Sequence, residues 1–103
     1  MSSDNVLDFE WDTAKALANF AKHGITFEQA ATVFLDPLAI TVYDNEHSQT
    51  EERWFTLGYE TGGALLVVVH AFQDLNPTMA TVRIISARVA TKQERRAYEE
   101  GPR

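Results

Sequence analysis

Three arginines are placed where a fixed positive charge has a chemical use. Arg53 opens a stretch of alternating apolar residues, and Arg83 and Arg88 flank an apolar stretch that reads as a strand. An arginine on a half-buried strand is costly unless a carboxylate or a bound phosphate pairs with it. Two interpretations stay open: structural ion pairs, for instance with Glu51 or Glu52, or planar cations that await an anion.

Three other side chains have types that suit proton transfer or the binding of an anion or an aromatic group. His70 ends the most apolar segment of the chain, and imidazole is the group best suited to proton transfer near neutral pH. A histidine in that position is more often a structural residue. Trp54 alternates with Phe55, so it is either an exposed stacking platform or part of a second core layer. Lys22 ends a predicted helix, where positive charge also simply favours the helix dipole.

Short motifs that would identify a well-known enzyme class are missing from the sequence. There is no P-loop, no G-x-G-x-x-G, no H-E-x-x-H and no G-x-S-x-G. The three histidines are too scattered to indicate a metal site, and the chain contains no cysteine that could act as a ligand or nucleophile. We therefore expect neither a metal nor a cofactor.

The length and composition predict one small domain. The chain has 103 residues, of which 45% are hydrophobic, and we expect a single domain over residues 1–103. The longest apolar run, residues 64–69, is far shorter than the roughly 20 residues that span a bilayer. The N-terminal residues do not have the pattern of a secretory signal. These features predict no membrane partner and a cytoplasmic location.

The net charge of −6 is distributed unevenly along the chain. Residues 83–103 carry a net charge of +3, whereas residues 1–82 carry −9. The acidic part argues against a general nucleic-acid coat protein, which would present a basic surface. The basic end is either the solvated face of a C-terminal helix or a small anion-binding focus on an acidic body.

Hydrophobic periodicity predicts two short helices at the start of the chain. The first covers residues 13–23, with Asp12 as its N-cap and Gly24 as its left-handed end. Its buried stripe is expected to comprise Ala14, Leu17, Ala18 and Ala21. Its polar face is expected to hold Lys15, Asn19 and Lys22. A capping box formed by Thr26 and Gln29 opens the second helix, which residues 36–37 end.

Alternating patterns after the helices predict an antiparallel sheet. We expect strands over residues 38–43, 53–59, 64–71 and 80–88, with a loop over residues 72–78. Residues 6–11 form either a short edge strand or an ordered arm. A final helix over residues 92–100 is so polar that it lies loosely on the sheet or docks on a partner. The predicted fold class is α+β, with two N-terminal helices, about four antiparallel strands and a C-terminal helix.

Three blocks of residues share their order and spacing with one protein family. They are Phe9-Glu10-Trp11-Asp12 with Lys22-His23-Gly24, then Glu51-Glu52-Arg53-Trp54, and last Arg83-Ile84-Ile85-Ser86-Ala87-Arg88. Over roughly residues 7–101 the chain resembles the BrnT-type toxins of the BrnT/BrnA type II toxin–antitoxin systems. The resemblance implies a RelE-like fold with two helices, an antiparallel sheet and a C-terminal helix.

The resemblance also implies a function. A BrnT-type toxin is a metal-independent endoribonuclease that cleaves RNA by attack of a 2′-hydroxyl and so inhibits translation. Its partner is a BrnA-type ribbon-helix-helix antitoxin, through which it contacts DNA only indirectly. For this function we expect catalytic roles for Arg53, His70, Arg83, Arg88 and Glu52, and RNA contacts from Lys22 and Trp54. The alternative is a non-catalytic binding or co-repressor subunit, whose acidic surface docks on a basic partner.

Overall fold

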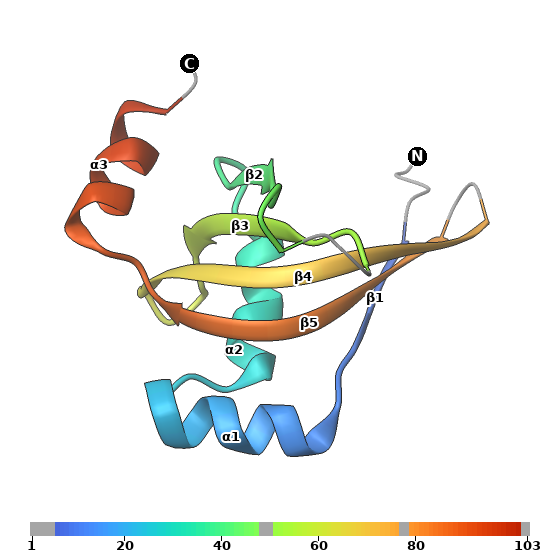
Figure 1. Ribbon diagram of the computed structural model, residues 1–103. Helices are drawn as coiled ribbons and strands as arrows, with labels where there is room; N and C mark the ends of the chain where they lie inside the picture. The colour runs from blue at the N-terminus through green and yellow to red at the C-terminus, as the bar shows by residue number, and fades with distance from the viewer. Residues whose placement is uncertain (1–5, 48–50, 77–78, 102–103) are drawn as a thin grey trace.

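The protein is a five-stranded sheet with its N-terminal helices against one side and its C-terminal helix at one end, as the computed structural model in Figure 1 shows. The structure describes residues 6–47, 51–76 and 79–101. The elements in chain order are β1 (Val6–Glu10), α1 (Thr13–His23), α2 (Phe27–Ala31), the short 3₁₀ helix η1 (Thr32–Leu35), β2 (Ile40–Tyr43), β3 (Trp54–Tyr59), β4 (Leu65–Asn76), β5 (Met79–Val89) and α3 (Lys92–Glu100). This order confirms an α+β fold.

The sheet is mixed rather than antiparallel. Its strand order is β1-β5-β4-β3-β2, and β1 pairs with β5 in parallel, while all other neighbours are antiparallel. The prediction of about four antiparallel strands was therefore wrong in two respects. The sheet has five strands, and β1 runs parallel to its neighbour. The first strand is the segment that the sequence left open between strand and arm. It pairs with β5, the last strand in the chain, and local periodicity carries no information on so distant a partner.

The predicted loop over residues 72–78 is also wrong for residues 72–76. These residues continue β4, which is 12 residues long, and β5 begins at Met79. The rest of the predicted loop, residues 77–78, lies outside the described residues. The reason for the error is polarity: Gln73 and Asp74 interrupt the apolar pattern, yet they still pair with Thr81 and Ala80 of β5.

The helix ends follow the capping rules that the sequence predicted. The Asp12 carboxylate accepts a hydrogen bond from the backbone N–H of Lys15 at 3.0 Å. Gly24 ends α1 with φ of 71°, a left-handed conformation that costs glycine little. Capping boxes open both α2, at Thr26, and α3, at Thr91. Local side-chain chemistry therefore sets these boundaries.

The core lies between one face of the sheet and the segment α2–η1. Phe27, Ala30 and Val33 of that segment are fully buried. The strands contribute Leu66, Val68, Val82, Ile84 and Ala87. The residues that alternate with these on β4, namely Val67, Val69 and Ala71, belong to the opposite face, which we call the outer face.

Helix α1 buries a different side from the predicted one. Ala14, Leu17, Ala18 and Ala21 are all exposed, Leu17 to 69%. Asn19, expected on the polar face, is instead 7% exposed and bonds to the backbone of Ala87 in β5 and of Ile25. The cause is a requirement of the backbone that hydrophobic periodicity does not reveal. The N–H and C=O groups of Ala87 are buried beyond the end of β1 and need hydrogen-bond partners, which Asn19 provides.

A buried tyrosine anchors helix α3. Tyr98 is 6% exposed, and its hydroxyl donates to Asp36 Oδ2 at 2.6 Å. The same oxygen accepts the Tyr59 backbone N–H at 2.9 Å. Burial raises the pKa of Asp36, but the hydrogen bonds from Tyr98, Tyr59 and Leu38 outweigh it, so that the pKa is lowered overall. The polar helix is therefore anchored through hydrogen bonds rather than an apolar stripe.

Candidate active site

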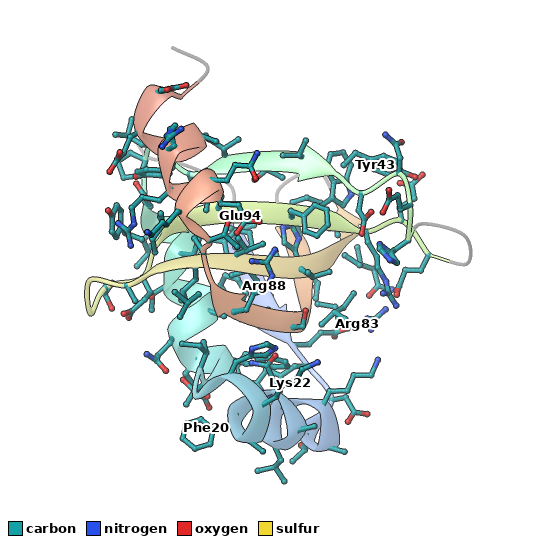
Figure 2. The ribbon with its side chains drawn as sticks, turned by 60° about the vertical axis from the view of Figure 1, so that its left-hand side comes forward. Phe20, Lys22, Tyr43, Arg83, Arg88 and Glu94 are labelled. Atoms are coloured by element: carbon teal, nitrogen blue, oxygen red, sulfur yellow. The ribbon has the colours of Figure 1, made fainter. Side chains whose placement is uncertain are left out.

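A bulge in β5 brings two of the predicted arginines to the same face of the sheet. Arg83 and Arg88 are five residues apart, and a regular strand would turn them to opposite faces. Val69 of β4 pairs with Ser86, but the next residue, His70, pairs with Ile84, so Ile85 has no partner. Arg83 and Arg88 therefore both lie on the outer face, opposite Ala71 and Val67 (Figure 2).

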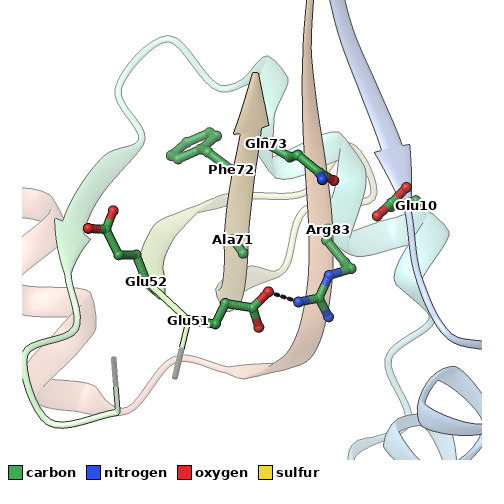
Figure 3. A pocket seen from close by; sticks show the side chains of 7 residues that line it. All are labelled: Glu10, Glu51, Glu52, Ala71, Phe72, Gln73 and Arg83. Atoms are coloured by element: carbon green, nitrogen blue, oxygen red, sulfur yellow. Dashed lines mark hydrogen bonds and ion pairs between the residues drawn. The ribbon is translucent and has the colours of Figure 1, made fainter. Parts of the chain in front are cut away.

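Arg83 lies in a pocket with three glutamates. The pocket has a volume of about 570 Å³ and is lined by Glu10, Glu51, Glu52, Ala71, Phe72, Gln73 and Arg83 (Figure 3). Arg83 forms an ion pair with Glu51, and both side chains are about one third exposed, at 32% and 35%. Glu10 reaches the pocket because it pairs in register with Arg83. Three carboxyl groups that can transfer protons and one fixed cation thus face the same space.

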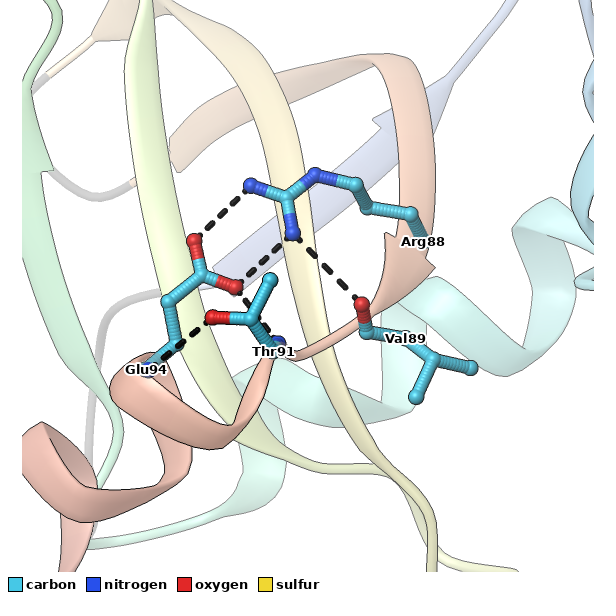
Figure 4. Close-up of polar contacts among 4 residues, drawn as sticks. All are labelled: Arg88, Val89, Thr91 and Glu94. Atoms are coloured by element: carbon cyan, nitrogen blue, oxygen red, sulfur yellow. Dashed lines mark hydrogen bonds and ion pairs between the residues drawn. The ribbon is translucent and has the colours of Figure 1, made fainter.

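Arg88 is held by a carboxylate of α3 instead of facing that pocket. Its two terminal nitrogens donate to the two oxygens of Glu94 at 2.8 Å each (Figure 4). Glu94 also accepts the Thr91 backbone N–H, as part of the capping box. This fork lowers the pKa of Glu94 to about 2 and raises that of Arg88. Arg88 thereby ties the end of β5 to the first turn of α3.

The two arginines are separated along the strand. Their partners on β4, Ala71 and Val67, are four residues apart, which corresponds to about 13 Å. In these positions the two guanidinium groups are bound to different carboxylates, Glu51 and Glu94. Arg83 therefore lines the pocket, whereas Arg88 lies on the same face of the sheet but outside the pocket.

Two more predicted residues lie next to the pocket in the chain. Glu52 lines it with an exposed side chain, and Arg53 follows Glu52 directly before β3 begins. Arg53 is half-buried, and its backbone carbonyl accepts the Asp44 N–H at 2.9 Å. The segment of residues 51–53 thus leads into β3 alongside Arg83.

His70 lies on the other face of the sheet, within the core. It is fully buried, and its Nε2 lies 2.7 Å from the Thr56 hydroxyl. Its ring packs edge-on against Phe34 and Phe72 at centroid distances of 4.9 and 4.8 Å. Burial lowers the pKa of His70 to about 4, so that it is uncharged at neutral pH. The prediction that His70 lies at the rim of the sheet was therefore wrong.

This buried histidine predicts a pH-dependent stability. The unfolded chain takes up a proton at His70 near pH 6.5, whereas the folded chain resists it down to about pH 4. The free energy of unfolding is therefore expected to have its full value above pH 6.5 and to fall by about 3 kcal/mol as the pH is lowered to 4. Urea unfolding at a series of pH values measures this slope.

The matched control for that measurement is His70→Gln. This variant has no imidazole, so its free energy of unfolding is expected to change little between pH 6.5 and pH 4.5, whatever its absolute value. Carboxylates with a lowered pKa, such as Glu94, contribute only at lower pH. A wild-type curve as flat as that of the variant contradicts the assignment.

Trp54 and Lys22 do not line the pocket of Arg83 either. Trp54 is half-buried and packs edge-on against Tyr43 and Phe72, at 5.1 and 5.9 Å between ring centroids. The predicted alternation with Phe55 is confirmed, since Trp54 pairs with His70 and Phe55 with Val69. Lys22 is exposed in the last turn of α1, where its positive charge interacts favourably with the negative end of the helix dipole.

Three polar residues of the pocket had no catalytic or RNA-binding role assigned from the sequence: Glu10, Gln73 and Glu51. Glu51 was considered only as a structural partner for an arginine, and that ion pair is now observed. Glu10 and Gln73 reach the pocket through strands β1 and β4. The alternation of Asp8 and Glu10 with Leu7 and Phe9 was the available signal, but it does not reveal the parallel partner.

A comparison with protein-family models gives one match. Residues 11–94 match the family described as the ribonuclease toxin BrnT of a type II toxin–antitoxin system. The chain belongs to the BrnT toxin family. The match spans most of the chain, including Arg53, Arg83 and Arg88, and it confirms the resemblance seen in the sequence.

A solved BrnT structure shares the fold. The crystal structure of the Brucella abortus ribonuclease toxin BrnT, at 1.1 Å resolution, superposes with a TM-score of 0.57 and 23% sequence identity. The alignment covers 84% of this chain and all of that chain. A search of curated proteins found no match. The fold of this BrnT-family chain is thus supported by a relative of low sequence identity.

Two searches of this BrnT-family chain for other kinds of site gave negative results for the residues that the structure describes. In that part of the chain no group of three His, Cys, Asp or Glu side chains is arranged to hold a metal ion. None of the described helices is long and apolar enough to cross a membrane.

Proposed function

We propose that this chain is the toxin of a type II toxin–antitoxin system and cleaves RNA at the pocket of Arg83 without a metal ion. One observation carries the proposal: a fixed guanidinium group and the carboxylates of Glu10, Glu51 and Glu52 line the same 570 Å³ space. Cleavage of RNA through its 2′-hydroxyl needs a base, an acid and a cation for the phosphorane, and these are the types of group present.

The mechanism divides these roles among the pocket residues. Glu52, exposed at the rim, accepts the proton of the 2′-hydroxyl, whose oxygen attacks the adjacent phosphorus. Arg83 stabilises the negative charge that develops on the phosphorane oxygens, because its planar fork donates two parallel hydrogen bonds. A second pocket carboxyl group, in its protonated form, gives a proton to the 5′-oxygen as it leaves. The products are a 2′,3′-cyclic phosphate and a free 5′-hydroxyl.

Other positively charged residues guide the rest of the strand in this proposal. Arg53 follows Glu52 directly and contacts the phosphate that is cleaved or its neighbour. Arg88 and Lys22 contact phosphates further along. His70 and Trp54 are left out of the chemistry, since His70 is fully buried on the core face and the ring of Trp54 packs against Tyr43 and Phe72.

The acidic character of the chain limits how it binds RNA. With a net charge of −6 and three glutamates at the pocket, only a few cations reach phosphates. The affinity for long RNA is therefore expected to be low, with a shallow dependence on salt concentration. A ribosome or a short structured substrate then supplies the orientation, which fits inhibition of translation in the cytoplasm.

The partner in this proposal is an antitoxin of the BrnA ribbon-helix-helix type. The toxin itself contacts DNA only through it. A relationship to the RelE-like superfamily is part of the same proposal, because that group combines a small sheet with RNA cleavage.

A second candidate is a non-catalytic co-repressor subunit. The observation that favours it is that Arg83 and Arg88 are each already paired, with Glu51 and Glu94. An arginine that already forms an ion pair with a carboxylate binds a phosphate more weakly. The open pocket beside Arg83 favours the enzyme, because a purely structural ion pair needs no such space.

Expression of the toxin alone in bacteria separates the two functions. The enzyme is expected to cause rapid growth arrest with fragmented RNA, and co-expression of the antitoxin restores growth. The purified toxin is expected to cleave RNA equally well with and without a chelator, and to leave an RNA with a 2′-deoxy substitution at the cleavage position intact. Harmless expression together with tight antitoxin binding supports the co-repressor, and cleavage that a chelator abolishes contradicts the metal-independent mechanism.

A further inference from the structure

An apolar groove lies beside β1, away from the pocket of Arg83. It has a volume of about 430 Å³ and is lined by Leu7, Phe9, Ala31, Thr32, Phe34 and Leu35. Leu35 is 74% exposed and Leu7 43% exposed, so water reaches two large apolar side chains at its rim. Its floor is rigid, because Phe9 and Phe34 pack together at 5.4 Å and both contact the core.

The groove follows an open edge of the sheet. β1 bonds to β5 on one side, and no strand among the described residues pairs with its other side. Unpaired backbone N–H and C=O groups along such an edge can accept a further strand. The edge is therefore a place where an extended segment gains main-chain hydrogen bonds and an apolar groove together.

The side chains of β1 define what kind of segment fits. Leu7 and Phe9 point to the groove, while Asp8 and Glu10 are exposed and alternate with them, on the outer face. A strand added to this edge has the same alternation of faces. Its apolar side chains enter the groove, and its other side chains meet two carboxylates, which favours lysine or arginine there.

We propose that the antitoxin binds this edge of the toxin with an extended segment in which apolar and basic residues alternate. The proposal rests on the antitoxin partner of the proposed function. The charge distribution supports it, since the part of the chain up to residue 82, which includes this edge, carries a net charge of −9. The exposed apolar face of α1 offers no edge and no comparable alternation of charge.

Binding at this edge explains how the antitoxin blocks the toxin. Glu10 belongs both to β1 and to the lining of the Arg83 pocket. A basic side chain that pairs with Glu10 lies at the rim of that pocket, on the face where RNA approaches. The antitoxin segment thus covers the substrate's path without replacing any catalytic residue.

The first experiment measures the affinity of the purified toxin for its purified antitoxin by calorimetry, without RNA. Leu35→Lys is expected to weaken binding at least tenfold, because it puts a charge at the groove. Two matched controls, Leu17→Lys on α1 and Val42→Lys on β2, change other exposed aliphatic residues and are expected to bind like the wild type. Circular dichroism checks that all variants are folded.

A second experiment reads the interface without any variant. Hydrogen exchange of the wild-type toxin is expected to show that the antitoxin protects the backbone N–H groups of β1 that face away from β5. Protection confined to α1 or β2, or weaker binding by Leu17→Lys or Val42→Lys alone, overturns the proposal. A toxin dimer that Leu35→Lys dissociates, with antitoxin affinity unchanged, also overturns it, because a second copy then occupies the edge.

These readouts are independent of catalysis. A chain that binds its antitoxin at β1 but does not cleave RNA contradicts the proposed ribonuclease activity and leaves this interface standing. A chain that cleaves RNA but binds its antitoxin elsewhere does the opposite.

Discussion

Replacing Arg83 with alanine is expected to reduce RNA cleavage by about 100-fold and to remove growth arrest. The reason is geometric: Arg83 is the cation that lines the pocket together with Glu10, Glu51 and Glu52. Without it, the charge on the phosphorane loses its preorganised donor. Its ion pair with Glu51 is about one third exposed, so the free energy of unfolding is expected to change by less than about 1 kcal/mol.

Two further variants make this measurement specific. Arg83→Lys keeps the charge but not the fork, and it is expected to recover only a minor part of the rate. Arg96→Ala removes an exposed arginine of α3 and is expected to leave cleavage unchanged, which controls for the net charge. Cleavage rates come from a short RNA substrate under single-turnover conditions. An Arg83→Ala protein that is folded and cleaves within threefold of the wild type contradicts the assignment.

Arg88 is a less informative target, although the sequence analysis predicted a catalytic role for it as well. Its guanidinium group forks onto Glu94, and Glu94 also closes the capping box of α3. An alanine at position 88 therefore disturbs the start of that helix as well as any phosphate contact. A loss of toxicity in that variant does not distinguish between the two causes, whereas Arg83 bonds only to a loop carboxylate in the described structure.

The local parts of the fold were predictable from the sequence. Capping residues and glycine predicted both ends of α1 and the start of α2, because the chemistry at a helix end involves neighbours within four residues. Strand alternation likewise placed Trp54 and Phe55 on opposite faces. Where a feature depends on a distant partner, the sequence did not determine it, as with the parallel pairing of β1 and β5.

The candidate site shows the same division. The sequence analysis selected Arg53, Arg83 and Arg88 because an arginine on an apolar strand needs an anion, and it named Glu52 both as a possible ion-pair partner and as a catalytic candidate. It could not show that a bulge at Ile85 turns Arg88 to the face of Arg83, since one unpaired residue changes every later orientation. It also placed His70 at a rim, because the continuation of β4 through residues 72–76 was not apparent from its polar residues. The sequence patterns thus identified which kinds of side chain take part in the site, but the pairing of the strands determines which of these side chains lie together.

Among the substitutions, the largest expected effect on stability comes from Asn19. Its side-chain amide donates to Ala87 O at 3.0 Å and accepts the Ala87 N–H at 3.0 Å, as a neighbouring strand would. It also donates to Ile25 O at 3.1 Å, which holds the turn between α1 and α2. β1 pairs with β5 only as far as Arg83, so this one amide completes the edge of β5 where β1 has already turned into α1.

Asn19→Leu is expected to lower the free energy of unfolding by about 3 kcal/mol and the melting temperature by roughly 15 °C. Leucine has the same branched shape and the same number of non-hydrogen atoms, so the loss comes mainly from three buried backbone groups that no longer have a partner. Lys15→Ala, an exposed change on the same helix, is the matched control and is expected to stay within about 0.5 kcal/mol of the wild type. Urea unfolding measures both. A leucine variant as stable as the wild type would mean that water or a shifted helix satisfies Ala87, and α1 would then be held by apolar contacts alone.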